Sequence, residues 1–201
     1  MLFFSVILLI LFFILAVPFT KFIYPIKYNL EIKQYAKERS LDPALIAAVI
    51  YEESRFESDR ESNKGAKGLM QIKQDTGADL ARGQKIQNFN DQSLFDPTLN
   101  INLGTYLLHD LYFRKYNQNL DLTLAAYNAG SGYVDKQQSQ GKGIEIKETL
   151  KYMKDVQQTE KIYATVYTTE LGLPKKNISA FEMWKISFRA LRDNLNAGET
   201  N

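Results

Sequence analysis

The amino-acid sequence predicts a mainly α-helical domain. Apolar residues recur every three to four positions along several stretches, which is the spacing of one helix face. Asp-Pro occurs at 42–43 and again at 96–97, and each pair signals a helix start, because Asp caps the first turn and Pro suits its first position. No stretch alternates apolar and polar residues over the length of a convincing strand.

Size and composition fit one globular domain with short extensions and exclude several kinds of site. The chain has 201 residues, of which 45% are hydrophobic and 24% charged. A net charge of +2 supplies no basic field of the kind that binds nucleic acid. There is no cysteine, which excludes disulfides, thiolate metal sites and cysteine nucleophiles. The only histidine, His109, is expected to be a packing or surface residue, so no metal and no cofactor are predicted.

The N-terminal stretch is predicted to be a membrane anchor over residues 1–20, followed by a linker over 21–27. Residues 2–19 are almost entirely apolar and uncharged, which is close to the roughly 20 residues that cross a bilayer as a helix. A secretory signal is the alternative, but its positive n-region and small-residue cleavage site are absent. Lys21 and Lys27 follow the stretch, and the positive-inside tendency places such residues in the cytoplasm, against an exported domain.

The chain is organised around a helix that begins after Asp42 and ends in two carboxylates, Glu52 and Glu53. Residues 44–50 are all apolar, so this helix is expected to be buried on most sides. Burying a carboxylate is unfavourable unless the group is paired or neutral. A glutamate at this end is therefore either solvated or held with a raised pKa for proton transfer. Both glutamates continue the apolar stripe, so their spacing alone does not choose between them.

Further helices are predicted on both sides of the central one from the same apolar spacing. They cover residues 31–38, 72–81, 120–128 and 146–171, and a long one starts at Pro97. Residues 134–143 are rich in Gln, Lys and Gly, and this composition predicts a loop.

Residues 171–201 are predicted to be a C-terminal amphipathic extension. Its large apolar residues are spaced three to four positions apart, as on one face of a helix. They are Phe181, Trp184, Phe188, Leu191 and Leu195. The stripe predicts either a helix packed on the domain or an aromatic face for a membrane surface or a partner.

Four short motifs follow one another in the chain. They are Glu-Ser-Arg-Phe at 53–56, the segment 62–71 that ends in Gly-Leu-Met-Gln, Ala-Tyr-Asn-Ala-Gly at 126–130 and Glu-Thr-Leu-Lys-Tyr-Met at 148–153. An Asp-Pro start also precedes an Asn-x-x-x-Gly helix, for which Asn102 is the candidate. Together these motifs resemble the family 1 lytic transglycosylases, whose soluble-lytic-transglycosylase (SLT) domain has a lysozyme-like, goose-type helical fold. The resemblance implies that fold for residues 28–170.

The resemblance also implies an enzyme that acts on peptidoglycan glycan strands. The family cleaves the β-1,4 bond between N-acetylmuramic acid and N-acetylglucosamine without water and leaves a 1,6-anhydro ring on the muramic acid. The glutamate before the motif's serine is the family's acid and base, which is Glu53 here, with Glu52 as the alternative. Ordinary glycoside hydrolysis uses two carboxylates. One suffices here because the C6 hydroxyl of the same sugar attacks the anomeric carbon.

Other motif positions are implied to bind or position the substrate. They are Ser62, Met70, Gln71, Tyr127, Asn128 and Tyr152. Tyr127 and Asn128 are expected to form the wall opposite the glutamate, and Tyr152 to hydrogen-bond near its carboxylate. Ile50, Met70 and Tyr127 are expected to supply the apolar surroundings that raise the pKa of Glu53. Local roles are the alternative for each, such as core packing for Tyr127.

Two other functions remain open on the residues alone. A hydrolytic muramidase of the same fold would need a second carboxylate, for which Asp59, Asp75 or Glu148 would have to serve. A membrane-tethered wall-binding subunit would not need Glu53.

The expected partners follow from the resemblance and the apolar N-terminus. They are peptidoglycan glycan strands, the membrane through the N-terminal helix and a secretion or cell-wall machinery, with no nucleic acid. The expected location is the cell membrane, as a single-pass protein with its catalytic domain on the cell-wall side.

Overall fold

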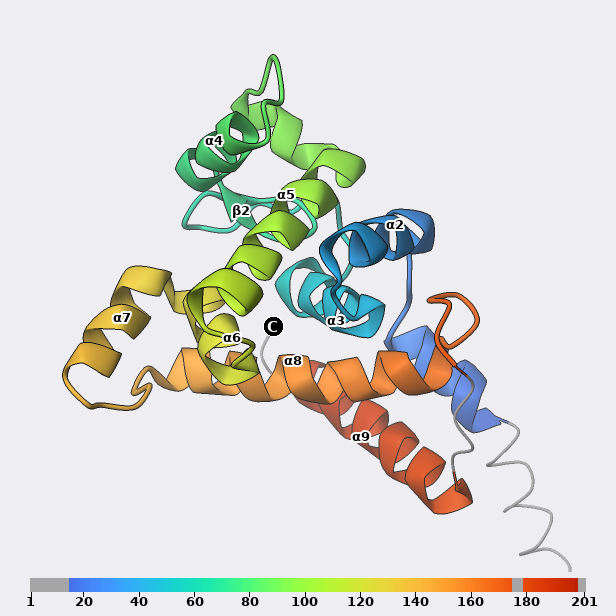
Figure 1. Cartoon of the computed structure of the whole chain (residues 1–201). Coiled ribbons are helices and arrows are strands. Elements are labelled where there is room, and N and C mark those ends of the chain that lie inside the picture. Colours follow the sequence, from blue (N-terminus) through green and yellow to red (C-terminus); the bar gives the residue numbers. More distant parts are fainter. Residues whose placement is uncertain (1–14, 175–178, 199–201) are drawn as a thin grey trace, which may run out of the picture.

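The structure, a computed structural model, describes residues 15–174 and 179–198. It is mainly helical, as predicted (Figure 1). After a helical segment over residues 15–23, the elements are α2 (Asn29–Arg39), α3 (Pro43–Ser54), β1 (Ala66–Lys67), β2 (Ile72–Lys73), α4 (Gln74–Gly83), η1 (Asp91–Phe95), α5 (Pro97–His109), the π-helical turn η2 (Asp110–Lys115), α6 (Leu120–Ala129), α7 (Ser131–Ser139), α8 (Lys147–Val166) and α9 (Ala180–Gly198).

The central helix of the fold is α3, which packs along α8 (Figure 1). Its start is fixed by Asp42, whose carboxylate accepts a hydrogen bond from the Ala44 N–H at 2.7 Å. Residues 44–51 are all buried, as the uninterrupted apolar run predicts. Arg55 ends the helix in the left-handed conformation, with φ 54°. The glutamates at the end of α3 are therefore held by a rigid, buried element.

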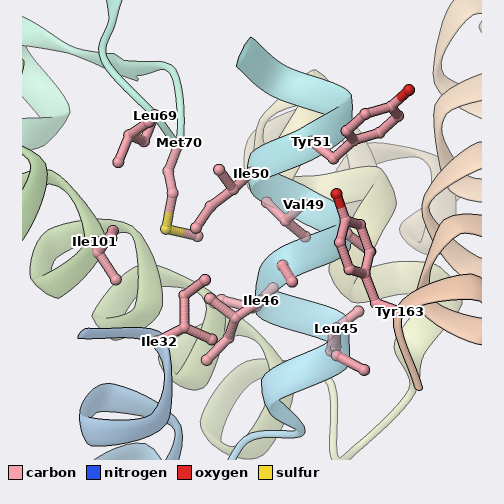
Figure 2. Close-up of a cluster of buried hydrophobic side chains, with 14 of the residues drawn as sticks. Ile32, Leu45, Ile46, Val49, Ile50, Tyr51, Leu69, Met70, Ile101 and Tyr163 are labelled. Atoms are coloured by element: carbon pink, nitrogen blue, oxygen red, sulfur yellow. The ribbon is translucent and has the colours of Figure 1, made fainter. Parts of the chain in front are cut away.

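The main core surrounds α3 on two sides. Figure 2 shows Ile50 and Ile46 directed towards Met70 and Ile101, whereas Tyr163 of α8 lies on the other side of the helix. These side chains are fully buried. Because α3 is covered on both sides, its end is fixed relative to α5, α6 and α8, which surround the candidate site.

The chain between α3 and α4 contains a small antiparallel hairpin. Ala66 pairs with Lys73 and Lys67 with Ile72, and residues 68–71 form the turn between them. Strands of two residues are too short to show an alternating pattern, which is why none is predicted from the sequence. The hairpin places the Gly-Leu-Met-Gln motif beside the end of α3.

Two predicted boundaries are wrong. Residues 134–143 were expected to be a loop, but α7 extends to Ser139, because Val134 and Gln137, one turn apart, are buried against the domain. A helix with so few buried positions gives little apolar periodicity. The helix predicted over 146–171 ends at Val166, and Tyr167 leaves helical geometry at its C-cap with φ −121°.

The residues that follow the predicted anchor pack against the domain. The Tyr163 hydroxyl donates to the Pro25 carbonyl at 2.7 Å, and the Tyr167 hydroxyl donates to the Tyr24 carbonyl at 2.7 Å. Within the described ranges, no helix combines the length and apolar character that crossing a bilayer requires. Most of the predicted anchor, residues 1–14, lies outside those ranges.

The C-terminal stripe forms a helix, α9, as predicted. Met183 and Ile186 pack against the core, so this helix is attached to the domain. In Figure 1 it lies on the opposite side of α8 from α3. Leu195, the last residue of the predicted stripe, lies outside the residues whose side chains are described.

Candidate active site

Glu53 lies in the last turn of α3 and is partly buried. Burial raises the pKa of its carboxyl from 4.5 to about 7, because removing water disfavours the charged form. The nearby Glu52 charge raises this pKa further, whereas Tyr152 and Arg60 lower it. Glu53 takes part in none of the ion pairs between described residues. A carboxyl with these properties can both give and accept a proton near neutral pH.

Glu52 has a different environment, although it is the adjacent residue. The Thr159 hydroxyl of α8 donates to its Oε1 at 2.6 Å, and Arg55 Nη2 lies 3.4 Å from its Oε2. Burial raises the pKa of Glu52, and the Arg55 charge and the Thr159 hydrogen bond lower it. Glu52 is thus a paired carboxylate that links α3 to α8, which favours Glu53 as the reactive group.

The hairpin turn is attached to α3 through Ser54. The buried Ser54 hydroxyl lies 2.8 Å from the Leu69 carbonyl and 3.1 Å from the Ile50 carbonyl, and can donate to either. This hydroxyl holds the turn next to Glu53. The serine of the Glu-Ser motif therefore has a structural role that the sequence pattern alone did not assign.

Asn100 holds the same turn from the side of α5. Its Oδ1 accepts a hydrogen bond from the Met70 N–H at 2.7 Å, and its Nδ2 donates to the Lys67 and Leu94 carbonyls at 3.0 and 2.7 Å. Gly68 has φ +74°, and a Cβ there would collide with the Leu94 carbonyl and the Asn100 amide. Only glycine fits so close an approach with a positive φ.

Asn100 and Gly104 are the two ends of the Asn-x-x-x-Gly pattern, so the assignment of that asparagine to Asn102 is wrong. Gly104 is required because a Cβ at this position would overlap the sulfur of Met70. Asn102 instead accepts a hydrogen bond from Arg39 Nη2 at 2.7 Å. The spacing of four residues to Gly104 identifies Asn100 and could have been read from the sequence.

Two tyrosines lie near Glu53 on neighbouring helices. The Tyr127 hydroxyl of α6 donates to the Met70 carbonyl at 2.9 Å. The Tyr152 hydroxyl of α8 is buried beside the Glu53 carboxyl and lowers its pKa through a hydrogen-bond interaction, although the contact falls short of an ordinary hydrogen-bond geometry. Burial raises the pKa of both tyrosines well above its usual value, so both are neutral donors. A buried phenol hydroxyl beside Glu53 can position the carboxyl and can also donate to a substrate oxygen.

The remaining predicted binding residues have the following positions. Met70 is fully buried, and its N–H and carbonyl are hydrogen-bonded to Asn100 and Tyr127. Asn128 is exposed, and its Oδ1 accepts a hydrogen bond from Thr149 at 2.8 Å, which joins α6 to α8. Ser62 Oγ accepts from the Ala66 N–H at 3.0 Å. Gln71 Nε2 donates to the Gly68 carbonyl at 2.9 Å.

The three carboxylates that a hydrolytic mechanism would require as partners do not meet Glu53 in the structure. Asp59, Asp75 and Glu148 are all exposed, and none is among the groups that shift the pKa of Glu53. His109 packs as predicted, with its Nδ1 2.7 Å from the Arg39 carbonyl. In the described part of the chain, no cluster of three or more His, Asp or Glu could hold a metal ion.

Comparison with known proteins identifies a family match over most of this domain. The family model described as "Transglycosylase SLT domain" matches residues 31–150. The soluble lytic murein transglycosylase of Escherichia coli K12 is 33% identical over 112 residues, which cover 55% of this chain and 17% of that protein. The membrane-bound lytic murein transglycosylase F of Pseudomonas putida F1 is 31% identical over 119 residues, 54% of this chain and 22% of that protein.

Solved structures give the same result for the fold. The 70 kDa soluble lytic transglycosylase of E. coli has a TM-score of 0.65 and 30% identity, over 79% of this chain and 27% of that one. An inactive glutamate-to-glutamine mutant of the Pseudomonas aeruginosa lytic transglycosylase has a TM-score of 0.64 and 30% identity, over 79% and 26%. The chain thus corresponds to about a quarter or less of each of these relatives, and the lysozyme-like fold expected from the resemblance is confirmed.

Proposed function

We propose that this chain, which belongs to the transglycosylase SLT domain family, is a peptidoglycan lytic transglycosylase with Glu53 as its single general acid and base. Its substrate is the β-1,4 bond between N-acetylmuramic acid and N-acetylglucosamine, and its product carries a 1,6-anhydro ring. The observation that carries the proposal is the difference between two adjacent carboxylates. Glu53 is partly buried with a pKa of about 7, whereas Glu52 is paired with Arg55 and Thr159.

The chemistry needs one proton donor that can later accept a proton. Glu53 first protonates the leaving glycosidic oxygen, which requires its neutral form. The carboxylate so formed then takes the proton from the C6 hydroxyl as that oxygen bonds to the anomeric carbon. The nucleophile belongs to the same sugar and has a high effective concentration once it is held in line, so no second carboxylate is needed to activate water. The exposed positions of Asp59, Asp75 and Glu148 are consistent with this.

Substrate contacts are proposed for the groups around Glu53. The buried Tyr152 hydroxyl is a donor for the reacting carboxylate or for a sugar oxygen. The Tyr127 hydroxyl donates a hydrogen bond to the Met70 carbonyl, and this contact keeps both residues in place near Glu53. Ser62, Gln71 and Asn128 are proposed to contact the glycan further from the reacting bond. Each keeps its side chain in a hydrogen bond that shapes the adjacent loop or helix end.

The location is also a proposal. Residues 1–20 anchor the chain in the cell membrane as a single span, and the domain lies on the cell-wall side. The support is the sequence before Lys21, which contains no charged residue. A secretion or cell-wall machinery remains a predicted partner.

The test is a digest of purified peptidoglycan by the full chain, read by liquid chromatography and mass spectrometry. Glu53→Gln is the test variant and Glu52→Gln the matched control, because the two differ by one position. We expect products one water lighter than ordinary muropeptides from the wild type and the Glu52→Gln variant, and none from Glu53→Gln. Products of ordinary mass would indicate a hydrolytic muramidase. Binding of the wall without cleavage by any variant would indicate a non-catalytic subunit.

A further inference from the structure

Most of the exposed large apolar residues among the described ones lie on two helices that are far apart in sequence. We call this surface the aromatic face and define it by Phe181, Trp184, Phe188 and Leu191 of α9 together with Leu15, Phe19 and Phe22 of the segment 15–23. Exposed fractions reach 61% for Phe181 and 79% for Phe22. Large apolar side chains gathered on neighbouring helices indicate an interaction site, whereas single scattered ones do not.

The contact between these two helices includes buried hydroxyls. The Thr20 and Ser187 hydroxyls are buried and lie 3.1 Å apart, and Ser187 Oγ also donates to the Ala16 carbonyl at 3.3 Å. A helix in water normally buries its large apolar residues and exposes its hydroxyls. Here Ala16, Thr20 and Ser187 are hydrogen-bonded between the two helices, whereas the aromatic side chains of α9 stay exposed and only its smaller apolar residues, Met183 and Ile186, pack against the core. Helices that face lipid pack in this way, through small residues and hydrogen bonds between helices.

Three further observations indicate that lipid covers the aromatic face. The rings of Phe181, Trp184 and Phe188 stack in sequence along α9, with centroids 6.0 and 5.4 Å apart. Lys185 lies on the same helix, with its Nζ 4.5 Å from the Phe181 ring centroid, and lysine beside tryptophan is typical of the membrane–water boundary. Residues 1–14, which run directly into the segment 15–23, contain no charged residue.

We infer that the aromatic face is a second membrane-contacting element, which seats α9 at the boundary between head groups and acyl chains of a lipid bilayer. An amphipathic helix with an aromatic face and a charged opposite face lies in this plane. The contact adds α9, at the other end of the chain, to a membrane span over residues 1–20, which contributes Leu15 and Phe19 to the aromatic face.

The position of the aromatic face also determines where the candidate site lies, if the proposed function holds. The segment 15–23 continues into Tyr24 and Pro25, which are tied to Tyr163 and Tyr167 at the C-terminal end of α8. Tyr152, beside Glu53, precedes Tyr163 by eleven residues, about 16 Å along the helix. In Figure 1, α9 lies across α8 from α3. A bilayer under the aromatic face therefore leaves the Glu53 site directed away from the membrane.

The test uses Trp184, because it is the only tryptophan of the chain and lies within the aromatic face. The full chain is reconstituted into vesicles of phosphatidylcholine and phosphatidylglycerol, with and without brominated acyl chains. We expect blue-shifted emission, strong quenching by the brominated lipid and several-fold weaker quenching by aqueous iodide than for free tryptophan amide. Full iodide quenching without lipid quenching would overturn the inference. Protection from both quenchers would also overturn it, because a protein surface would then cover the face.

A pair of variants separates the aromatic face from an anchor at residues 1–20. When the Phe188→Glu variant is reconstituted into the same vesicles, we expect the chain to remain in the membrane through its N-terminal span. We expect Trp184 emission to shift to the red and iodide quenching of Trp184 to rise several-fold, because α9 no longer lies in the lipid. Leu30→Glu, at another exposed apolar residue, is the matched control and leaves Trp184 unchanged. Digestion of solubilised glycan is expected to be equal for both variants, so loss of this contact is distinguishable from failure of the proposed function. An unchanged Trp184 signal in Phe188→Glu would contradict the inference.

Discussion

Glu52 and Glu53 show how neighbouring residues of one type acquire different chemistry. At the end of a buried helix, consecutive side chains point in directions about 100° apart. One carboxylate therefore meets Arg55 and Thr159, while the other is desolvated without an ion pair. The first contributes to the contact between α3 and α8. The second has the proton affinity that acid–base chemistry at neutral pH needs.

The pH dependence of the rate follows from the Glu53 pKa of about 7. Since the acid step needs the neutral carboxyl, kcat/KM is expected to fall about tenfold per pH unit above pH 7. The Glu52 charge raises this pKa, so Glu52→Gln is expected to move the alkaline limb to lower pH. The measurement is the rate of muropeptide release from pH 5 to pH 9 for both proteins. An alkaline limb that stays in place, or moves to higher pH, contradicts the assignment.

The raised pKa of Glu53 should also be visible, independently of activity, in the pH dependence of the free energy of unfolding. The ordinary pKa of a glutamate, 4.5, describes the unfolded chain, whereas the pKa of Glu53 is about 7 in the folded chain. Between pH 4.5 and pH 7 the folded chain keeps the Glu53 proton that the unfolded chain has lost. The free energy of unfolding therefore falls as pH rises, by at most about 3 kcal/mol. Glu53→Gln lacks this loss. Its unfolding free energy relative to wild type is therefore expected to be higher at pH 8 than at pH 5, as measured by denaturant titration. A difference that does not change with pH would show that Glu53 is not desolvated.

At the scale of elements, the site depends on a turn held by two helices. The Ser54 hydroxyl of α3 donates a hydrogen bond to the Leu69 carbonyl. The Asn100 side chain of α5 accepts one from the Met70 N–H and donates one to the Lys67 carbonyl. Met70 itself is fully buried. The Gly-Leu-Met-Gln turn therefore has little freedom of its own, and its position next to Glu53 is set by packing.

Asn100→Ala tests this dependence, with Asn102→Ala as the matched control. Removing the Asn100 amide leaves a buried N–H and two carbonyls without their partner, which is expected to lower the unfolding free energy by about 3 kcal/mol and to reduce activity strongly. Asn102 loses one half-buried hydrogen bond to Arg39, at a cost of about 1 kcal/mol or less. Both values come from denaturant unfolding. Equal destabilisation by the two variants would argue against the role given to Asn100.

The sequence predicts elements best where local signals and burial agree. The Asp42–Pro43 start and the apolar run place α3 correctly, and the stripe beginning at Phe181 predicts α9. The helix α7 was missed because only Val134 and Gln137 face the domain. The roles of Ser54 and Asn100 in holding the turn could not be derived, because the Leu69 carbonyl is 15 residues from Ser54 and the Met70 N–H is 30 residues from Asn100, and only packing brings them together.

For the whole molecule, α8 connects the candidate site to the N-terminal segment. Near the site, the Thr159 hydroxyl donates a hydrogen bond to Glu52. Further along the helix, Tyr163 donates to the Pro25 carbonyl and Tyr167 to the Tyr24 carbonyl. These contacts join the chain that follows the predicted anchor to the helix that carries Tyr152. The domain is thus expected to have a fixed orientation relative to its N-terminal segment.

Tyr167→Phe tests this connection. The Tyr167 hydroxyl donates to the Tyr24 carbonyl at 2.7 Å, so its loss is expected to cost about 1 kcal/mol and to increase amide hydrogen exchange over residues 20–26. Glycan cleavage by the detergent-solubilised chain should be unchanged. Tyr112→Phe is the control, because the Tyr112 hydroxyl makes no hydrogen bond to any residue within 15–174 or 179–198. Exchange that stays at the wild-type rate in Tyr167→Phe would show that this contact does not hold the segment.

The most direct test of the central claim is a digest of peptidoglycan by the full chain in water labelled with heavy oxygen. If Glu53 directs the C6 hydroxyl of the muramic acid to the anomeric carbon, water does not enter the product. We predict anhydro products without the label from wild type, and none from Glu53→Gln. Reducing-end products that carry the label would contradict the account, because they would show that water is the nucleophile and that a second group activates it.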